Sequence, residues 1–146
     1  MKIESFAFQN NGEIPSRFTC EGENINPELL FKEVPRETKN LALIMDDPDA
    51  PNGTFVHWVM WNIPPKITEI NQGSEPIDAM VGLNGVGKNE YIGPCPPNGM
   101  HHYFFKLYAL DAMIELSKNT NAFDLKKIME GHVIERAELV GLYEKK

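Results

Sequence analysis

The stretch FVHWVMWNI, residues 55 to 63, is the part of the sequence that decides the fold. It is dense in β-branched and aromatic residues, which favour strands, and a strand sends successive side chains to opposite faces. His57, Val59 and Trp61 are therefore expected on one face, and the other face is equally apolar. Because both faces are apolar, the sequence predicts a buried central strand in which His57 is a polar group among apolar neighbours.

Other segments also have the character of strands. NLALIMD, residues 40–46, predicts a buried strand that runs into the turn 47–51, and residues 102–110 predict a second central strand. Four side chains of that second central strand are expected on one face: Tyr103, Phe105, Leu107 and Ala109. Shorter strands are expected at 2–8 and 28–31. The eleven glycines and eleven prolines mark many turns, so the composition favours a mainly β fold over a helical bundle.

One short helix is expected near the C-terminal end. Asn119, Thr120 and Asn121 offer N-cap side chains, apolar residues then recur at near-helical spacing, and Gly131 suits a C-terminal stop. The tail, residues 133–143, allows two interpretations: IERAEL would extend a helix, whereas LVGLY favours a final strand.

Length and charge restrict the class of protein. The chain of 146 residues has the usual size of one domain, which we expect to span residues 1–146. Its formal charge of -7 opposes nucleic-acid binding. No signal peptide or membrane-spanning stretch is recognisable, so we expect a cytoplasmic protein without integral membrane association. Cys20 and Cys95 lack the spacing of a disulfide scaffold or zinc site and are expected to be reduced thiols.

The residues whose side chains could bind a ligand or react are histidines and aspartates around the predicted strands. His57, His101 and His102 adjoin aromatic residues, and Asp47 and Asp49 lie in a proline-bounded loop. Taken alone, a strand histidine is more often a hydrogen-bonded core residue, and an aspartate beside proline more often a turn residue. Together they suggest that a rigid loop holds a carboxylate near His57, where it would fix the tautomer and favour the protonated ring. Such a cation could receive an anion.

The segment GPCPPNG, residues 93–99, has the composition of a loop that can point backbone N–H groups at a ligand. It lacks the lysine and the serine or threonine of a phosphate-binding P-loop, so nucleotide hydrolysis is not expected. No serine or cysteine lies in a nucleophile motif, and an enzyme is therefore not expected either. A metal site built from His57, His101 and Asp47 is conceivable by residue type alone.

Several motifs in a fixed order resemble the phosphatidylethanolamine-binding protein family, including its bacterial and archaeal Raf-kinase-inhibitor-like members. The motifs are DPDAP (47–51), VHWVMWNIP (56–64), NGVG (84–87), GPCPPNG (93–99) and HHYFFKLYALD (101–111). The resemblance covers nearly the whole chain. It implies a two-sheet antiparallel β-sandwich with one or two short helices, and a pocket for phosphate, acetate or phosphoethanolamine head groups. It supplies no metal and no cofactor.

The resemblance also implies which residues form the pocket. The family's pocket residues correspond to Asp47, Asp49, His57, Pro96, His101 and Tyr103, with Gly93, Pro94 and Cys95 in the adjoining loop. His102 ranks lower. The family tends to use a cis peptide near the second proline of DPDAP, which makes the bond before Pro51 a candidate for one, although only a small share of X-Pro bonds are cis. The chain stops at Lys146, and we expect it to lack the C-terminal helix of longer eukaryotic relatives.

The predicted function is binding of a small anion or phospholipid head group, with a regulatory role. In this hypothesis His57 and His101 donate hydrogen bonds to the anion, and Asp47 keeps His57 oriented and charged. Tyr103 and Trp58 would wall the site, and Asp49 or an aromatic face would meet an ammonium group. The alternative is an inhibitor of a serine protease or kinase that acts through surface loops. A homodimer is a further expectation from the resemblance.

Overall fold

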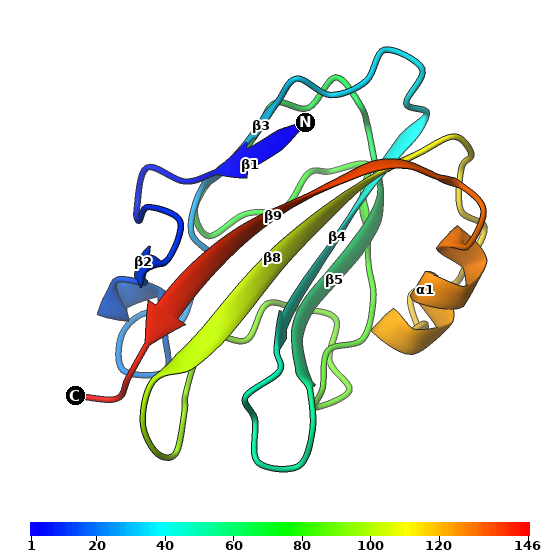
Figure 1. Ribbon diagram of the computed structural model, residues 1–146. Coiled ribbons are helices and arrows are strands. Elements are labelled where there is room, and N and C mark those ends of the chain that lie inside the picture. The colour runs from blue at the N-terminus through cyan, green and yellow to red at the C-terminus, as the bar shows by residue number, and fades with distance from the viewer.

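The computed structural model describes residues 1–146 and is dominated by strands (Figure 1). In chain order the elements are β1 Lys2–Glu4, β2 Gly12–Glu13, the 3-10 turn η1 Ser16–Phe18, β3 Leu29–Lys32, β4 Asn40–Asp47, β5 Phe55–Ile63, β6 Glu69–Ile70, β7 Met80–Val81, β8 His101–Leu110, α1 Ala122–Met129 and β9 Val133–Tyr143. The long strands β4, β5, β8 and β9 run side by side through the centre of the molecule.

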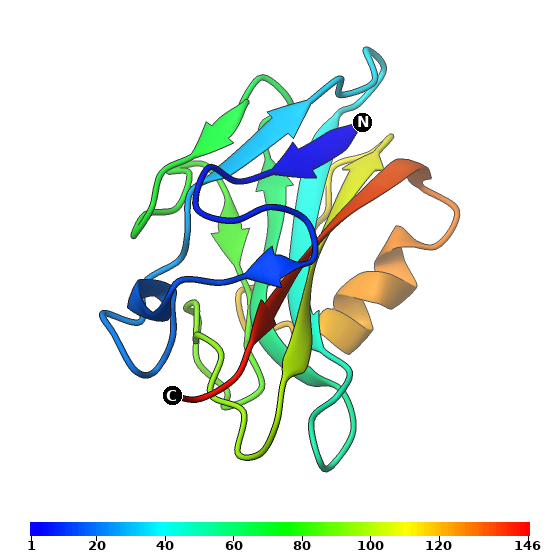
Figure 2. The ribbon, with the colours of Figure 1, turned by 60° about the vertical axis from the view of Figure 1, so that its left-hand side comes forward.

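The strands form two sheets. The large sheet has the order β2-β9-β8-β4-β5-β7, and the small sheet has the order β1-β3-β6. Figure 2 shows the small sheet on one side of the large sheet and α1 on the other. The predicted mainly β, two-sheet fold with a short helix is confirmed. The one departure from antiparallel pairing is β2, a two-residue edge strand that pairs parallel to β9.

Apolar side chains fill both sides of the large sheet. A cluster of 20 buried residues lies between the sheets and includes all four residues predicted to share a face of β8: Tyr103, Phe105, Leu107 and Ala109. A second cluster of 10 buried residues packs on the opposite face with α1. The central strands are therefore buried on both faces, which explains their continuous apolar sequences.

A β-bulge changes the direction of His57. Between Val56 and Trp58, β5 has one residue more than the facing part of β4. A bulge interrupts the strict alternation of a strand, and bulges commonly reorient a side chain beside a functional site. Val59 and Trp61 share a face as predicted and pack in the cluster under α1, but His57 lies against the ring of Tyr103, at 5.3 Å between centroids. The prediction that His57 and Val59 share a face is therefore wrong.

The helix and the tail follow the local sequence signals. The Asn121 side chain caps α1 by accepting a hydrogen bond of 2.9 Å from the Asp124 backbone N–H. Gly131 adopts a φ of 81°, a conformation that favours glycine, and the chain then turns into β9. The whole tail is a strand paired with β8, so of the two interpretations the strand is correct. None of the helices is long and apolar enough to cross a membrane.

Two local predictions are wrong. Cys20 and Cys95 are joined in a disulfide rather than present as free thiols. They are 75 residues apart in the sequence, and only the packing of their loops brings the Cα atoms to 5.5 Å. No peptide bond is cis, so the bond before Pro51 is trans. The loop reverses direction instead through turns that end at Gly53, which has a φ of 100°.

Candidate ligand-binding site

A cavity of about 350 Å³ lies at the end of the large sheet where β4 ends and β5 and β8 begin. Antiparallel pairing brings these strand ends to the same edge, because each neighbour runs in the opposite direction. Seven of the nine predicted site residues line the cavity: Asp47, His57, Gly93, Cys95, Pro96, His101 and Tyr103. Its volume suits a small ligand rather than a macromolecular segment.

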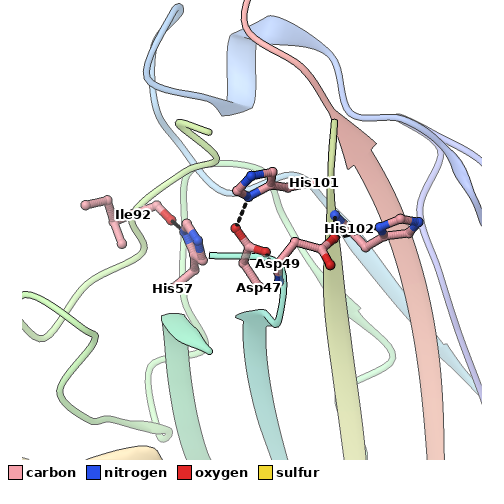
Figure 3. Close-up of polar contacts among 6 residues, drawn as sticks. All are labelled: Asp47, Asp49, His57, Ile92, His101 and His102. Atoms are coloured by element: carbon pink, nitrogen blue, oxygen red, sulfur yellow. Dashed lines mark hydrogen bonds and ion pairs between the residues drawn. The ribbon is translucent and has the colours of Figure 1, made fainter. Parts of the chain in front are cut away.

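Asp47 and His101 form a buried pair at the cavity. The Nδ1 atom of His101 lies 2.7 Å from one carboxylate oxygen of Asp47, and the other oxygen accepts from the Asp49 backbone N–H at 2.8 Å. Figure 3 shows the His101 ring against the Asp47 carboxylate, with His57 directed elsewhere. The expected partnership of Asp47 with His57 is therefore wrong, because the loop after β4 turns this carboxylate toward the start of β8.

His57 has a backbone partner instead of a carboxylate. Its Nδ1 donates to the carbonyl oxygen of Ile92 at 2.6 Å (Figure 3). Burial lowers the pKa of His57, and this effect exceeds the opposing effects of the Ile92 hydrogen bond and of the Asp47 charge. The neutral ring is thus favoured near neutral pH. The expectation that His57 is held protonated by Asp47 is not met.

Three polar groups of residues that line the cavity have no protein partner. The Nε2 atoms of His57 and His101 have no protein partner. Neither atom is completely buried, and both residues line the cavity. The hydroxyl of Tyr103 is fully buried and unpaired. Burial raises the pKa of Tyr103 far above its ordinary value, so the hydroxyl keeps its proton and can donate. Its ring lies near both imidazoles, with the centroids 5.3 Å from His57 and 6.4 Å from His101.

Asp49 and Pro94 do not line the cavity. Asp49 accepts from His102 twice, from Nδ1 at 2.7 Å and from the backbone N–H at 2.8 Å, and these hydrogen bonds lower the pKa of Asp49. Both side chains of this pair are on the surface. Pro94 is buried, and its carbonyl oxygen accepts from the Cys20 backbone N–H at 3.1 Å. The Asp49–His102 pair thus fastens the loop after β4 to β8 outside the cavity.

Trp58 is not a wall of the cavity either. It is fully buried, its ring meets Tyr91 edge-on at 5.4 Å, and its Nε1 donates to Glu75 at 3.2 Å. The aromatic wall beside His57 is formed instead by Phe55 and Tyr103. Phe55 starts β5 and lies 4.8 Å from the His57 ring.

The loop that contains Gly93 is attached to the N-terminal part of the chain. The Gly93 backbone N–H donates to Asn24 Oδ1 at 2.8 Å, and a Cβ on Gly93 would lie 2.4 Å from the Phe18 carbonyl oxygen. The Cys20–Cys95 disulfide adds a covalent link at the same place. This attachment fixes one rim of the cavity.

Two features of the site have no signal in the sequence. The carbonyl oxygen of Ile92 orients His57, and every residue type carries such an oxygen. Residues 50–55 also line the cavity, although Asn52, Gly53 and Thr54 belonged to no motif singled out beforehand. No three or more His, Cys, Asp or Glu side chains are placed so that they could hold one metal ion.

The fold and the cavity define a class of small two-sheet β proteins with a polar pocket at one end of the central sheet. The family model described as "Phosphatidylethanolamine-binding protein" matches residues 4–144. The chain therefore belongs to the phosphatidylethanolamine-binding protein family. It is 48% identical to a UPF0098 protein of Methanothermobacter thermautotrophicus, over 98% of each chain. It is 49% identical to a UPF0098 protein of Pyrococcus horikoshii, over all of this chain and 77% of the relative.

Solved structures show the same fold. The phosphatidylethanolamine-binding protein homologue CT736 from Chlamydia trachomatis superimposes with a TM-score of 0.96 at 39% identity, over 99% of this chain and 97% of that one. E. coli YBCL, described as a member of the mammalian PEBP family, superimposes with a TM-score of 0.92 at 30% identity, over 99% and 98%. The predicted family membership is confirmed.

Proposed function

We propose that the protein binds a small oxyanion, as inorganic phosphate or as the phosphate of a phospholipid head group, in the cavity between His57 and His101. The observation that carries this proposal is the unpaired hydroxyl of Tyr103. A buried hydroxyl without a partner costs about 1–3 kcal/mol, and a ligand oxygen in the cavity would satisfy it.

His101 supplies the second contact. Its Nδ1 is bound to the Asp47 carboxylate at 2.7 Å, and its Nε2 has no protein partner and is left for a ligand. Local polar contacts of this kind are needed, because the whole chain carries a formal charge of -7 and would otherwise repel an anion.

Calorimetric titration of phosphate into the wild-type protein and into Tyr103→Phe tests the proposal. Hydrogen bonds to charged groups contribute about 1.5–3 kcal/mol, so the variant is expected to bind at least tenfold more weakly. Its stability without ligand should not fall, because the lost hydroxyl had no partner. Tyr108→Phe is the matched control, since Tyr108 lies on the same strand but packs in the cluster under α1. Equal affinities for all three proteins would refute the proposal.

We propose that this protein binds its ligand without chemical turnover. Inhibition of a serine protease or a kinase through surface loops, a regulatory role and a homodimer all stay predictions.

A cytoplasmic location also stays a prediction, and the disulfide bears on it because most cytosols keep thiols reduced. Alkylation of free thiols in intact cells, followed by non-reducing electrophoresis, would report the state of Cys20 and Cys95.

A further inference from the structure

We propose that the cavity selects oxyanions that carry a hydrogen-bond donor next to their negative charge, and that Nε2 of His57 is the group that makes this selection. Monohydrogen phosphate would be accepted, whereas sulfate, which has the same shape but no proton, would be disfavoured. The inference rests on the proposed function and adds to it a ligand class and a specificity-determining residue.

The tautomer of His57 is set by geometry. A carbonyl oxygen can only accept a hydrogen bond, so the 2.6 Å contact with Ile92 places a proton on Nδ1. Only Nε2 can then change its protonation. In the neutral ring Nε2 carries a lone pair. This lone pair accepts a hydrogen bond from a ligand and repels a ligand oxygen that has no proton.

The surroundings of His57 favour that neutral ring. The side chain is 5% exposed, and the rings of Phe55 and Tyr103 meet it edge-on from two sides. Four ionisable groups lie near it: Asp46 and Asp47 on the adjacent strand β4, and His101 and Tyr103 on β8, the next strand of the sheet. The two aspartates favour a charged ring and His101 opposes it, but burial has the largest effect and lowers the pKa of His57.

Asp47 also lines the cavity, but each of its carboxylate oxygens already has a partner. One oxygen accepts from His101 Nδ1 and the other accepts from the Asp49 backbone N–H. Nε2 of the neutral His57 ring is thus an acceptor without a protein partner, and the Tyr103 hydroxyl is a donor without one. An oxyanion that only accepts leaves the His57 lone pair unpaired, and a site with an unpaired polar group rejects such an analogue strongly.

Two sources of the donor are chemically distinct. In free phosphate the donor is the P–OH group, whereas a phosphodiester head group has no such proton and would have to supply an ammonium N–H. Glycerophosphoethanolamine and glycerophosphocholine are matched diesters that differ in this respect, because the choline nitrogen carries no proton. The pairs phosphate with sulfate and glycerophosphoethanolamine with glycerophosphocholine therefore test the same principle for the two sources.

Calorimetric titration of all four compounds at about pH 7.5 is the experiment. We expect phosphate to bind at least roughly tenfold more tightly than sulfate. A similar preference for glycerophosphoethanolamine over glycerophosphocholine would identify a head group as a further ligand source, and binding of neither diester would restrict the class to free phosphate. Equal affinities for phosphate and sulfate would overturn the selectivity while leaving the proposed function intact. No binding by any of the four would overturn both.

The role of His57 has its own test. His57→Phe removes the lone pair but leaves Tyr103 and His101, so the ratio of phosphate to sulfate affinity should fall toward one. An unchanged ratio in a folded variant would assign the selectivity to another group. Should the variant not fold, sulfate titration of the wild-type protein serves instead. Sulfate affinity is expected to rise as the pH is lowered from about 7.5 to below about 6.5, the ordinary pKa of histidine, because Nε2 of His57 then takes up a proton. A flat or falling profile would overturn the inference.

Discussion

The Cys20–Cys95 disulfide should contribute strongly to stability. It closes a loop of 75 residues. The chain-entropy model gives about 4.5 kcal/mol for a loop of this length at 25 °C, through the restriction of the unfolded chain. That is a large share of the roughly 5–15 kcal/mol by which a domain of this size is stable. Both cysteines are exposed, so a small dithiol reductant can reach the bond without unfolding the protein.

Urea denaturation of the oxidised and the dithiol-reduced protein measures this contribution. Reduction should lower the free energy of unfolding by about 3–5 kcal/mol and the Tm by on the order of 10 °C. The double variant Cys20→Ser and Cys95→Ser should match the reduced protein and should not respond to reductant. A difference of less than about 1 kcal/mol between oxidised and reduced protein would refute the reasoning, because the long loop would then not be constrained in the unfolded state.

Three further predictions concern the core, the loop and the pH response. Phe105→Ala should cost about 3–5 kcal/mol by urea denaturation, because its ring is fully buried between the sheets; a loss below about 1 kcal/mol would contradict that packing. Gly93→Ala should weaken phosphate binding in calorimetry, since the new Cβ would meet the Phe18 carbonyl oxygen at 2.4 Å and displace the rim; unchanged affinity would show that the rim is not needed. The pKa of His57 is lowered in the folded protein, so as the pH falls through about 6.5 the unfolded chain binds a proton at this residue before the folded protein does. The free energy of unfolding should therefore decline below that pH. His57→Gln should decline less between about pH 7.5 and pH 5.5, and an equal decline would assign the effect to other groups.

Much of the fold could be predicted from local sequence. The apolar, β-branched and aromatic segments at 40–46 and 55–63 are strands, because a sheet buried on both faces accepts only such residues. The cap at Asn121 and the stop at Gly131 are also local signals, since each depends on one residue's own backbone geometry. The order of motifs was enough to indicate the family and to nominate seven residues that line the cavity.

The internal arrangement of the site could not be predicted in the same way. Asp47 was expected beside His57, but it pairs with His101, because the choice depends on how two strand ends and a turn meet in space. The face of His57 depends on a bulge, which is a property of the pairing between β4 and β5 and not of either segment alone. One extra residue in that pairing decides which side of the sheet the imidazole joins.

The sequence by itself determined which residue types are available: a strand histidine, a second histidine, a tyrosine and an aspartate beside proline-rich loops. The tertiary structure alone decided the role of each. It buries His57 against a backbone carbonyl, leaves the Tyr103 hydroxyl unpaired and joins two cysteines from distant loops. The physical reason is that protonation, hydrogen-bond satisfaction and disulfide pairing depend on burial and on distances between remote segments, which local sequence patterns do not encode.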